Sequence, residues 1–370
     1  MAFTEYYVAA DAAGGGIGTI GDPFTLTEAL EGLTVGALYW IESGSYTVAT
    51  SEAVDTAGTS ASFNLFKGYS TTTGDLDTQG RNSDGSLNTT NFPVITITDS
   101  LTIPSYVFFM NCEITGSYAG DMLGNSASDH FGFINCKLTN SADSTLANLI
   151  RGDDQVTTIN CDFYTGTGSF YSVIRCDYFG LIQGCRCIVT GTTSNSIFEV
   201  SVPTIVGCWV SGNGQVVLSI SSTTSDAGVV VSNTFYNCGD IIELPNSSIT
   251  NLPYLINNHA TDSTGWINNL YSATANAALI EVNNRVRDIT TLRTGVGDGI
   301  VLDEVDTDTG GPETDYTDYA NGDLSLIPTA PGIDAGLGFG IWNIGASQNE
   351  YSSTGGGGGI IKVDLNGGIN

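Results

Sequence analysis

Short apolar segments recur along the middle of the chain at a nearly constant interval. Most of them end in a small polar residue followed by a cysteine, as in segments 133–136 and 205–208. The equivalent positions are Cys112, Cys136, Cys161, Cys185, Cys208, Asn233 and Asn258. They lie 24, 25, 24, 23, 25 and 25 residues apart. A second apolar segment follows in each unit, and Gly, Ser, Thr and Asn fill the connections, so the pattern predicts short strands joined by turns.

This period predicts an all-β fold, a right-handed parallel β-helix with about 24 residues per coil. Successive coils stack about 4.8 Å apart, so equivalent side chains lie above one another. We therefore expect an inward structural ladder of small apolar groups, formed by Cys112, Cys136, Cys161, Cys185 and Cys208. The preceding Asn111, Asn135 and Asn160 are expected to form an amide ladder at a corner. A leucine-rich repeat would need a leucine-and-asparagine consensus and a helix in each unit, and the chain has neither.

A short helix is predicted near the N-terminus, over residues 24–31. Thr25 and Glu28 have the spacing of a capping box, which satisfies free backbone groups at the start of a helix. The first coil of a β-helix has an open edge that invites aggregation, so we expect this helix to cover it. An ordinary surface helix is the alternative interpretation.

Both ends of the repetitive region carry motifs that resemble a known family. Tyr6-Tyr7-Val8 leads into Gly14-Gly15-Gly16, and Leu38-Tyr39-Trp40-Ile41 follows the predicted helix. Later come Pro331-Gly332-Ile333-Asp334 and Asn343-Ile344-Gly345-Ala346. Together, residues 5–347 resemble the pectate-lyase-like β-helix proteins, most closely the non-enzymatic members found in phage virions. The resemblance implies the fold and leaves the function open, because this fold serves many functions.

The composition changes after residue 347, which predicts three regions. Residues 1–347 form the β-helix with its N-terminal cap, and residues 348–359 form a polar, Gly-rich linker. In residues 360–370, apolar and polar positions alternate as in one strand. We expect this strand to bind a partner through Ile360, Ile361, Val363 and Leu365. A frayed terminus is the alternative.

The charge balance of the 370 residues excludes several functions. There are 39 acidic and 10 basic residues, a formal net charge of -29, so a nucleic acid is not expected as a partner. No apolar run reaches the roughly 18 residues of a membrane span, and the first residues do not form a secretory signal. The eight cysteines contain no Cys-x-x-Cys motif, so we expect buried thiols in a reducing compartment, with no metal and no cofactor.

Few residues suggest catalysis. Asp153 and Asp154 resemble one fragment of the polygalacturonase site, whose companion motifs are absent. Paired carboxylates from adjacent coils would suit a glycosidase, and the candidates by position are Asp162, Asp177, Glu199 and Glu243. The acidic segment 303–310 matches no complete calcium loop. Arg285, Arg287 and Arg293 form the only basic group, which is little for a lyase acting on polyanions.

A rigid, acidic solenoid with few candidate catalytic groups favours a structural role. Our leading hypothesis is a capsid decoration, or cement, protein on the virion surface, made in the host cytoplasm. Its expected partner is the major capsid protein or another virion protein, and the resemblance to phage β-helices implies a homotrimer. One alternative is a tail spike or fibre that binds a surface glycan through Trp209 and Trp266. The other is a polysaccharide lyase or hydrolase.

Overall fold

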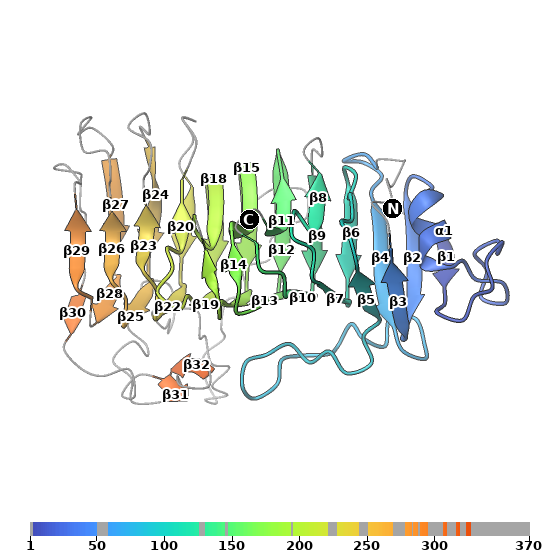
Figure 1. The fold of residues 1–370 in the computed structure, drawn as a ribbon, viewed down its shortest axis with the longest axis horizontal. Coiled ribbons are helices and arrows are strands. Elements are labelled where there is room, and N and C mark those ends of the chain that lie inside the picture. The colour runs from blue at the N-terminus through green and yellow to red at the C-terminus, as the bar shows by residue number, and fades with distance from the viewer. Residues whose placement is uncertain are drawn as a thin grey trace, which may run out of the picture.

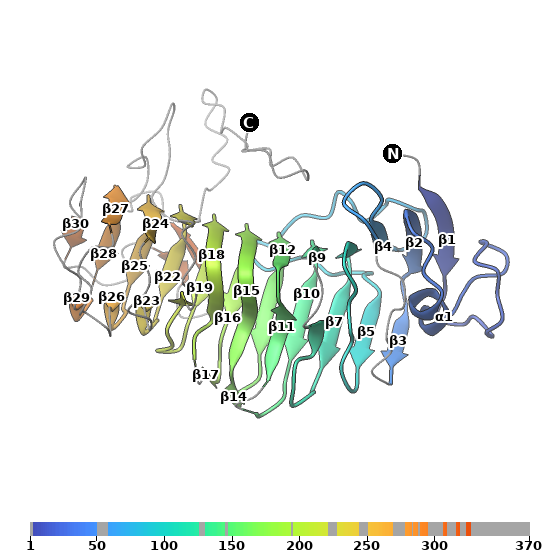
Figure 2. The same cartoon turned by 90° about the horizontal axis from the view of Figure 1, so that it is seen from above.

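The protein is an all-β parallel solenoid with about 25 residues per turn, as the computed structural model shows, so the predicted fold class is confirmed. The described residues are 3–49, 58–125, 130–144, 147–193, 195–220, 228–243, 251–268, 278–282, 284–287, 289–294, 306–308, 316–318 and 323–326. Figures 1 and 2 show the coils stacked along the long axis, from α1 at one end to β29 and β30 at the other.

The largest sheet contains two parallel ribbons that merge where β15 and β18 run through both. The first ribbon consists of β1 (Thr4–Val8), β2 (Ala37–Glu42), β4 (Asn64–Tyr69), β6 (Val107–Met110), β9 (His130–Ile134), β12 (Gln155–Ile159), β15 (Ser172–Gln183), β18 (Phe198–Val206), β21 (Val229–Val231), β24 (Asn251–Ile256) and β27 (Ala278–Val282). The second adds β8 (Leu123–Asn125), β11 (Asn148–Gly152), β20 (Leu218–Ser219), β23 (Asp240–Glu243), β26 (Gly265–Asn268) and β29 (Thr291–Thr294).

A separate parallel sheet of 11 strands closes the other side of the coils. It consists of β3 (Ser45–Val48), β5 (Val94–Ile97), β7 (Glu113–Gly116), β10 (Lys137–Asn140), β13 (Asp162–Thr165), β16 (Arg186–Ile188), β19 (Trp209–Ser211), β22 (Thr234–Tyr236), β25 (His259–Thr261), β28 (Arg285–Arg287) and β30 (Asp306–Asp308). Two short pairs complete the described strands: parallel β14 (Ser169–Phe170) with β17 (Thr192–Thr193), and antiparallel β31 (Tyr316–Asp318) with β32 (Asp323–Leu326).

The predicted N-terminal helix is α1 (Leu26–Glu31), and it begins two residues later than expected. Thr25 is its N-cap, so the preceding Phe24 lies outside the helix. Both bonds of the capping box are present between Thr25 and Glu28. Leu26, Ala29 and Leu30 are buried, so the helix packs its apolar side on the interior of the solenoid.

The interior contains ladders of identical or similar side chains because equivalent residues of adjacent coils are in register. An aromatic ladder joins five coils through Tyr6, Tyr39, Phe66, Phe109 and Phe133, with ring centroids between 4.7 and 5.9 Å apart. Stacking of this kind adds to the area buried in each pair.

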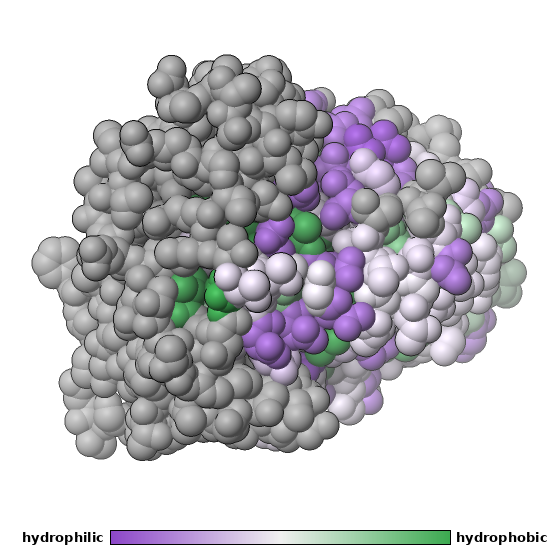
Figure 3. All heavy atoms as spheres, turned by 60° about the vertical axis from the view of Figure 1, so that its left-hand side comes forward, coloured by the Kyte–Doolittle hydropathy of each residue, from purple (hydrophilic) through white to green (hydrophobic). Residues whose placement is uncertain are grey.

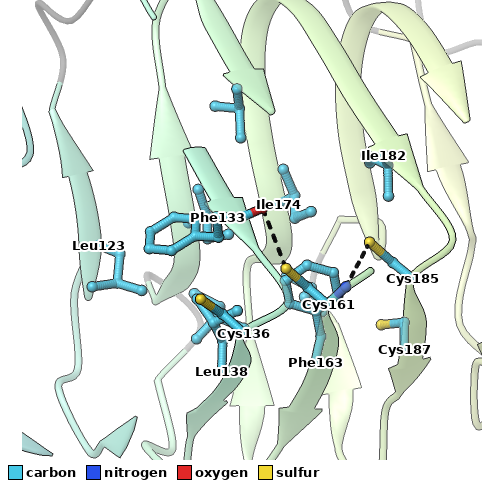
Figure 4. Packing of buried hydrophobic residues seen from close by; sticks show 14 of the residues in the cluster. Leu123, Phe133, Cys136, Leu138, Cys161, Phe163, Ile174, Ile182, Cys185 and Cys187 are labelled. Atoms are coloured by element: carbon cyan, nitrogen blue, oxygen red, sulfur yellow. Dashed lines mark hydrogen bonds between the residues drawn. The ribbon is translucent and has the colours of Figure 1, made fainter. Parts of the chain in front are cut away.

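The five repeat cysteines lie on the inside of successive coils. They are fully buried and none forms a disulfide. Figure 4 shows Cys136, Cys161 and Cys185 in one row, with Cys161 Sγ directed at the Phe133 carbonyl oxygen, 3.4 Å away. Burial raises the pKa of the Cys112, Cys161 and Cys208 thiols. These groups are therefore neutral and act as small apolar side chains.

Asparagine replaces cysteine in this column over the last coils. Asn233, Asn258 and Asn284 are buried at the positions that follow Cys208. Each accepts a backbone N–H from the coil before it, as in Cys208 N to Asn233 Oδ1 at 2.8 Å. Each also donates its amide to a carbonyl of the interior, so the buried polar groups are paired.

Residues 327–370 lie outside the described residues. The predicted linker at 348–359, the strand at 360–370 with Ile360, Ile361, Val363 and Leu365, and the boundary at residue 347 therefore remain predictions. Of the acidic segment 303–310, only the backbone strand β30 is described.

Candidate functional site

Residues 70–92 connect β4 to β5 and lie across the outside of the 11-stranded sheet; we call this segment the strap. Figure 1 shows it below the coils, reaching from β4 and β5 toward the middle of the molecule. Leu76, Leu87 and Phe92 are buried in a small core of its own. The strap therefore covers several coils that are far from it in the sequence.

Arg81 of the strap binds a carboxylate buried on β13. Its Nη1 lies 2.5 Å from Asp162 Oδ1, and the Asp162 side chain is only 1% exposed. The other oxygen of Asp162 accepts the backbone N–H of Leu87 at 2.7 Å, and Arg186 lies 3.9 Å away. Asp162 was a candidate carboxylate of a glycosidase pair. The Tyr164 hydroxyl also donates to it at 3.4 Å, so its burial and its four partners indicate that Asp162 holds the strap in place instead.

Residues of the strap form hydrogen bonds with both ends of the corner amide ladder. Asn135 donates to Asn111 at 2.6 Å, and Asn160 donates to Asn135 at 2.8 Å. At one end Asn111 donates to the carboxylate of Asp77, and at the other Arg81 donates to the amide oxygen of Asn160. The chain of hydrogen bonds thus runs in one direction, from a cationic donor to an anionic acceptor, and both charged ends strengthen it.

Positive φ angles explain why asparagine occupies this corner. Asn111, Asn135 and Asn160 have φ between 52° and 57°, a region that asparagine and glycine tolerate. The next two coils have Gly184 and Gly207 at the same place, with φ of 62° and 63°. The corner conformation is therefore common to these coils, whereas the amide ladder belongs to the coils beneath the strap.

Another charged cluster lies on the second ribbon, where Arg151, Arg175 and Glu199 are aligned on β11, β15 and β18. Arg151 Nη1 is 3.0 Å from Asp121 Oδ2. Arg175 Nε is 3.3 Å from Asp177 Oδ1 and 3.5 Å from Glu199 Oε2. This cluster contains two of the residues that were predicted as a glycosidase pair.

The geometry of the cluster does not suit glycoside hydrolysis. A glycosidase needs two carboxyl groups about 5–9 Å apart with the sugar between them. Here the guanidinium of Arg175 occupies the space between Asp177 and Glu199. Each carboxylate is paired with a cation, so the arrangement stabilises the surface of the coils.

Burial shifts the pKa of several carboxyl groups in and near this cluster. It raises the pKa of Glu199, which is 5% exposed, and Arg175 opposes that shift. The pKa of Asp153 is raised by burial and by the neighbouring Asp177. On β23, burial and Asp240 raise the pKa of Glu243. Asp154 is exposed and Asp153 is half-buried, so the two carboxyl groups differ in environment.

The two tryptophans proposed as sugar platforms are in different environments. Trp266 is completely buried in the core, so the prediction that it binds a glycan is wrong. Its place on β26 puts it on the inward side of the coil. Trp209 is half-buried, and its ring lies against Gly85 of the strap, where an added methyl group would overlap the ring. The strap therefore occupies part of the Trp209 surface.

The outward positions of the first ribbon form a mostly apolar surface; we call it the outer face. Alternate residues of these strands point inward and outward, as in β12, where Val156 and Thr158 are buried inward. One outward column is made of Met110, Ile134, Ile159, Gln183, Val206, Val231 and Ile256. The neighbouring column is made of Phe108, Gly132, Thr157, Leu181, Thr204, Val229 and Tyr254.

These outward positions, from β6 to β24, contain no carboxylate and no cation among the described residues. Only His130 at the edge is titratable in the physiological range, and burial lowers its pKa. The column ends toward the N-terminus at Lys67, which lies over Trp40 and pairs with Asp77 at 2.6 Å. The sequence signal for this surface is the residue two places before each repeat cysteine, which sequence reasoning overlooked. In Figure 3, polar and weakly polar residues dominate the coloured part of the surface in view.

The three arginines of the predicted basic group lie on strands of two different sheets. Arg285 and Arg287 belong to β28 in one sheet, and Arg293 belongs to β29 in the other. Among the described residues, no group of three or more His, Cys, Asp or Glu is arranged to hold a metal ion. No helix in that same part is both long and apolar enough to span a membrane.

Comparisons with known proteins show the fold. No family model matches the chain, and no curated protein matches its sequence. The crystal structure of the pectate lyase Pel9A is similar with a TM-score of 0.51 and 12% identity, over 94% of this chain and 96% of that one. A rhamnogalacturonan lyase gives a TM-score of 0.49 and 14% identity, over 85% and 90%. The chain thus shares the parallel β-helix fold of Pel9A, and at this identity the likeness extends to the fold alone.

Proposed function

We propose that this protein is a structural component of a phage virion, a capsid decoration protein that acts as a homotrimer on the particle surface. In this proposal it is made in the host cytoplasm and attaches to the major capsid protein or another virion protein. The predicted strand at residues 360–370 provides the attachment, and the linker at 348–359 allows the rigid rod to stand off the shell. Attachment would stabilise the shell by mass action.

The observation that carries the proposal is the internal use of charged and polar side chains. Asp162, the corner asparagines and Arg175 all bind other parts of the same chain. Such contacts hold adjacent coils in register and fix the strap. A chain that uses its functional groups in this way is suited to a role that depends on shape and rigidity.

An enzyme that acts on polysaccharides is the alternative offered by the fold class, since Pel9A is described as a pectate lyase. The pairing of Arg175 with both Asp177 and Glu199 argues against hydrolysis at that cluster. The net charge of -29 argues against a polyanionic substrate. The hypothesis of a glycan-binding tail spike relied on two tryptophans as sugar-binding residues. Only Trp209 remains a candidate, because Trp266 is buried.

Co-sedimentation with capsid shells tests the proposal. The shells are assembled from the major capsid protein of the phage that encodes this chain. We expect the full-length protein to sediment with them and a variant that ends at residue 347 to stay in solution. If the full-length protein also stays in solution, the decoration role is wrong. If both proteins sediment, the role holds and the assigned attachment strand is wrong.

A further inference from the structure

The outer face is a mostly apolar strip on a chain that is otherwise strongly acidic, and Gln183 is the polar residue in its first column. Ile134, Ile159, Val206, Val231 and Ile256 are half-buried at these outward positions. Leu181, Val229 and Tyr254 extend the strip sideways, and Tyr254 is 40% exposed. These side chains are the same kind of residue that fills the core, but they point away from it.

The strip is large enough to be an interaction surface. From Met110 to Ile256 there are six steps between coils, which at about 4.8 Å each give a length of about 29 Å. A strand of five residues is about 16 Å long, so the projected area of the face is about 450 Å², most of it apolar but with Gln183, Thr157 and Thr204 included. Contiguous apolar patches above a few hundred Å² mark interaction sites in soluble proteins.

We infer that the outer face packs against the same face of other copies of this chain, side by side along the solenoid axis. The inference rests on the proposed homotrimer and names the surface that holds it together. A second copy is the partner whose side chains repeat with the same spacing of about 4.8 Å, so the ridges of one strip match the grooves of the other along their full length.

The distribution of charge supports a second copy over a basic partner. Each chain carries a formal charge of -29, and like charges repel when copies approach. The outer face has no carboxylate at the described outward positions from β6 to β24, so contact along this face buries none. A basic partner would instead be recognised by carboxylates within the contact surface.

The charge also predicts how salt affects association. Carboxylates outside the contact still repel each other across the copies, and salt screens that repulsion. Apolar contact itself is not weakened by salt. Association of copies through the outer face is therefore expected to strengthen as ionic strength rises, whereas binding to a basic partner weakens.

Sedimentation equilibrium of the full-length protein at about 0.05 M and about 0.5 M salt tests the inference. The expected result is a mass that is a multiple of 38.6 kDa, with a lower dissociation constant at the higher salt concentration. Ile159→Lys places a charge in the middle of the strip while reducing the net negative charge of the chain. We expect it to raise the dissociation constant by about 100-fold, since an unpaired charge would be buried.

Thr139→Lys is the matched control, because Thr139 is half-buried at an outward position of β10 on the other sheet. It makes the same charge change and should keep the mass of the original protein. Val206→Lys repeats the test at another position of the same column if Ile159→Lys does not fold, which circular dichroism would reveal.

Three results would overturn the inference: a monomeric protein at both salt concentrations, association that weakens with salt, or folded outer-face variants that keep the original mass. A monomeric protein would also contradict the proposed homotrimer, but none of these results decides whether the protein binds capsid shells. Co-sedimentation answers that question separately, so the failure of this inference and the failure of the proposed function can be told apart.

Discussion

At the scale of single residues, this chain neutralises its buried charges locally. Asp162 is the clearest case, because one oxygen faces the Arg81 guanidinium and the other accepts a backbone N–H. A buried ion pair adds little by itself to stability, but removal of one partner leaves a charge without compensation. Asp162 thus holds the strap in position, and the strap supplies the groups that compensate the buried charge of Asp162.

We predict that Arg81→Ala lowers the free energy of unfolding by about 3 kcal/mol, because it leaves the Asp162 carboxylate buried with only the more distant Arg186 as a cation. Arg151→Ala is the control, since the Arg151–Asp121 pair is about one-third exposed, and we expect it to cost at most about 1 kcal/mol. Urea unfolding followed by circular dichroism measures both values. Equal losses would show that the buried pair has no special role.

Glu199 should make stability depend on pH in the mildly acidic range. Burial raises its pKa in the folded state, so between the unfolded pKa of about 4.3 and the higher folded pKa the native state binds more protons. The stability of the native protein therefore falls as pH rises through this window. We predict that Glu199→Gln, which cannot ionise, becomes more stable relative to the original protein as pH rises from 4 to 7, by on the order of 1 kcal/mol.

Urea unfolding of both proteins at pH 4 and pH 7 measures this difference. The same substitution at an exposed carboxylate, Glu31→Gln, serves as the control and should show no such trend. If the stability of Glu199→Gln relative to the original protein falls or stays constant as pH rises, the account is contradicted.

At the scale of elements, the corners of the coils combine a backbone requirement with a side-chain requirement. Asn135 must have a positive φ, and its amide must bind both neighbouring asparagines. Gly184 and Gly207 meet only the first requirement. This difference allows the two contributions to be separated by substitution.

We predict that Asn135→Gly lowers the free energy of unfolding by about 1–3 kcal/mol, because the partner groups on Asn111 and Asn160 lose their hydrogen bonds. Asn135→Ala should cost roughly a further 1–2 kcal/mol, since alanine is strained at positive φ. Thermal and urea unfolding measure the order of stability. If the alanine variant equals the glycine variant, backbone strain does not contribute at this corner.

The strap gives another prediction at this scale. Gly85 has φ of 76° and lies against the ring of Trp209, so Gly85→Ala should displace the strap and expose Arg81 to trypsin. We expect a loss of about 1–3 kcal/mol and rapid cleavage within residues 70–92. Gly80→Ala is the control, because no atom lies within 4 Å of the added methyl group. Equal resistance of both variants to trypsin would contradict the proposed contact.

The elements could be predicted where the sequence repeats. The spacing of Cys112, Cys136 and Cys161 identified the coils, and Thr25 with Glu28 identified the start of the helix. The strap could not be predicted, because residues 70–92 do not repeat and their contacts are distant, as between Arg81 and Asp162. The ion pair between Arg175 and Glu199 could not be predicted from the sequence either. Such a prediction requires both the register of the strands and the direction of each side chain.

At the scale of the whole molecule, the ladders make the solenoid a continuous rod. Each coil contacts mainly its neighbours, so stability depends on many similar interfaces in series. The strap adds contacts between coils that are not adjacent, from Lys67 near the N-terminal end to Trp209 near the middle. A rod of this kind presents one long apolar face and an acidic remainder, which suits association with its own copies.

Electron microscopy of intact particles that carry this chain, at side-chain resolution, tests the structural role most directly. The account predicts copies packed through the outer face, standing on the shell, with residues 360–370 bound to a protein of the capsid lattice. A map that places the chain on a tail, or that shows residues 360–370 without a partner on the particle, would contradict it.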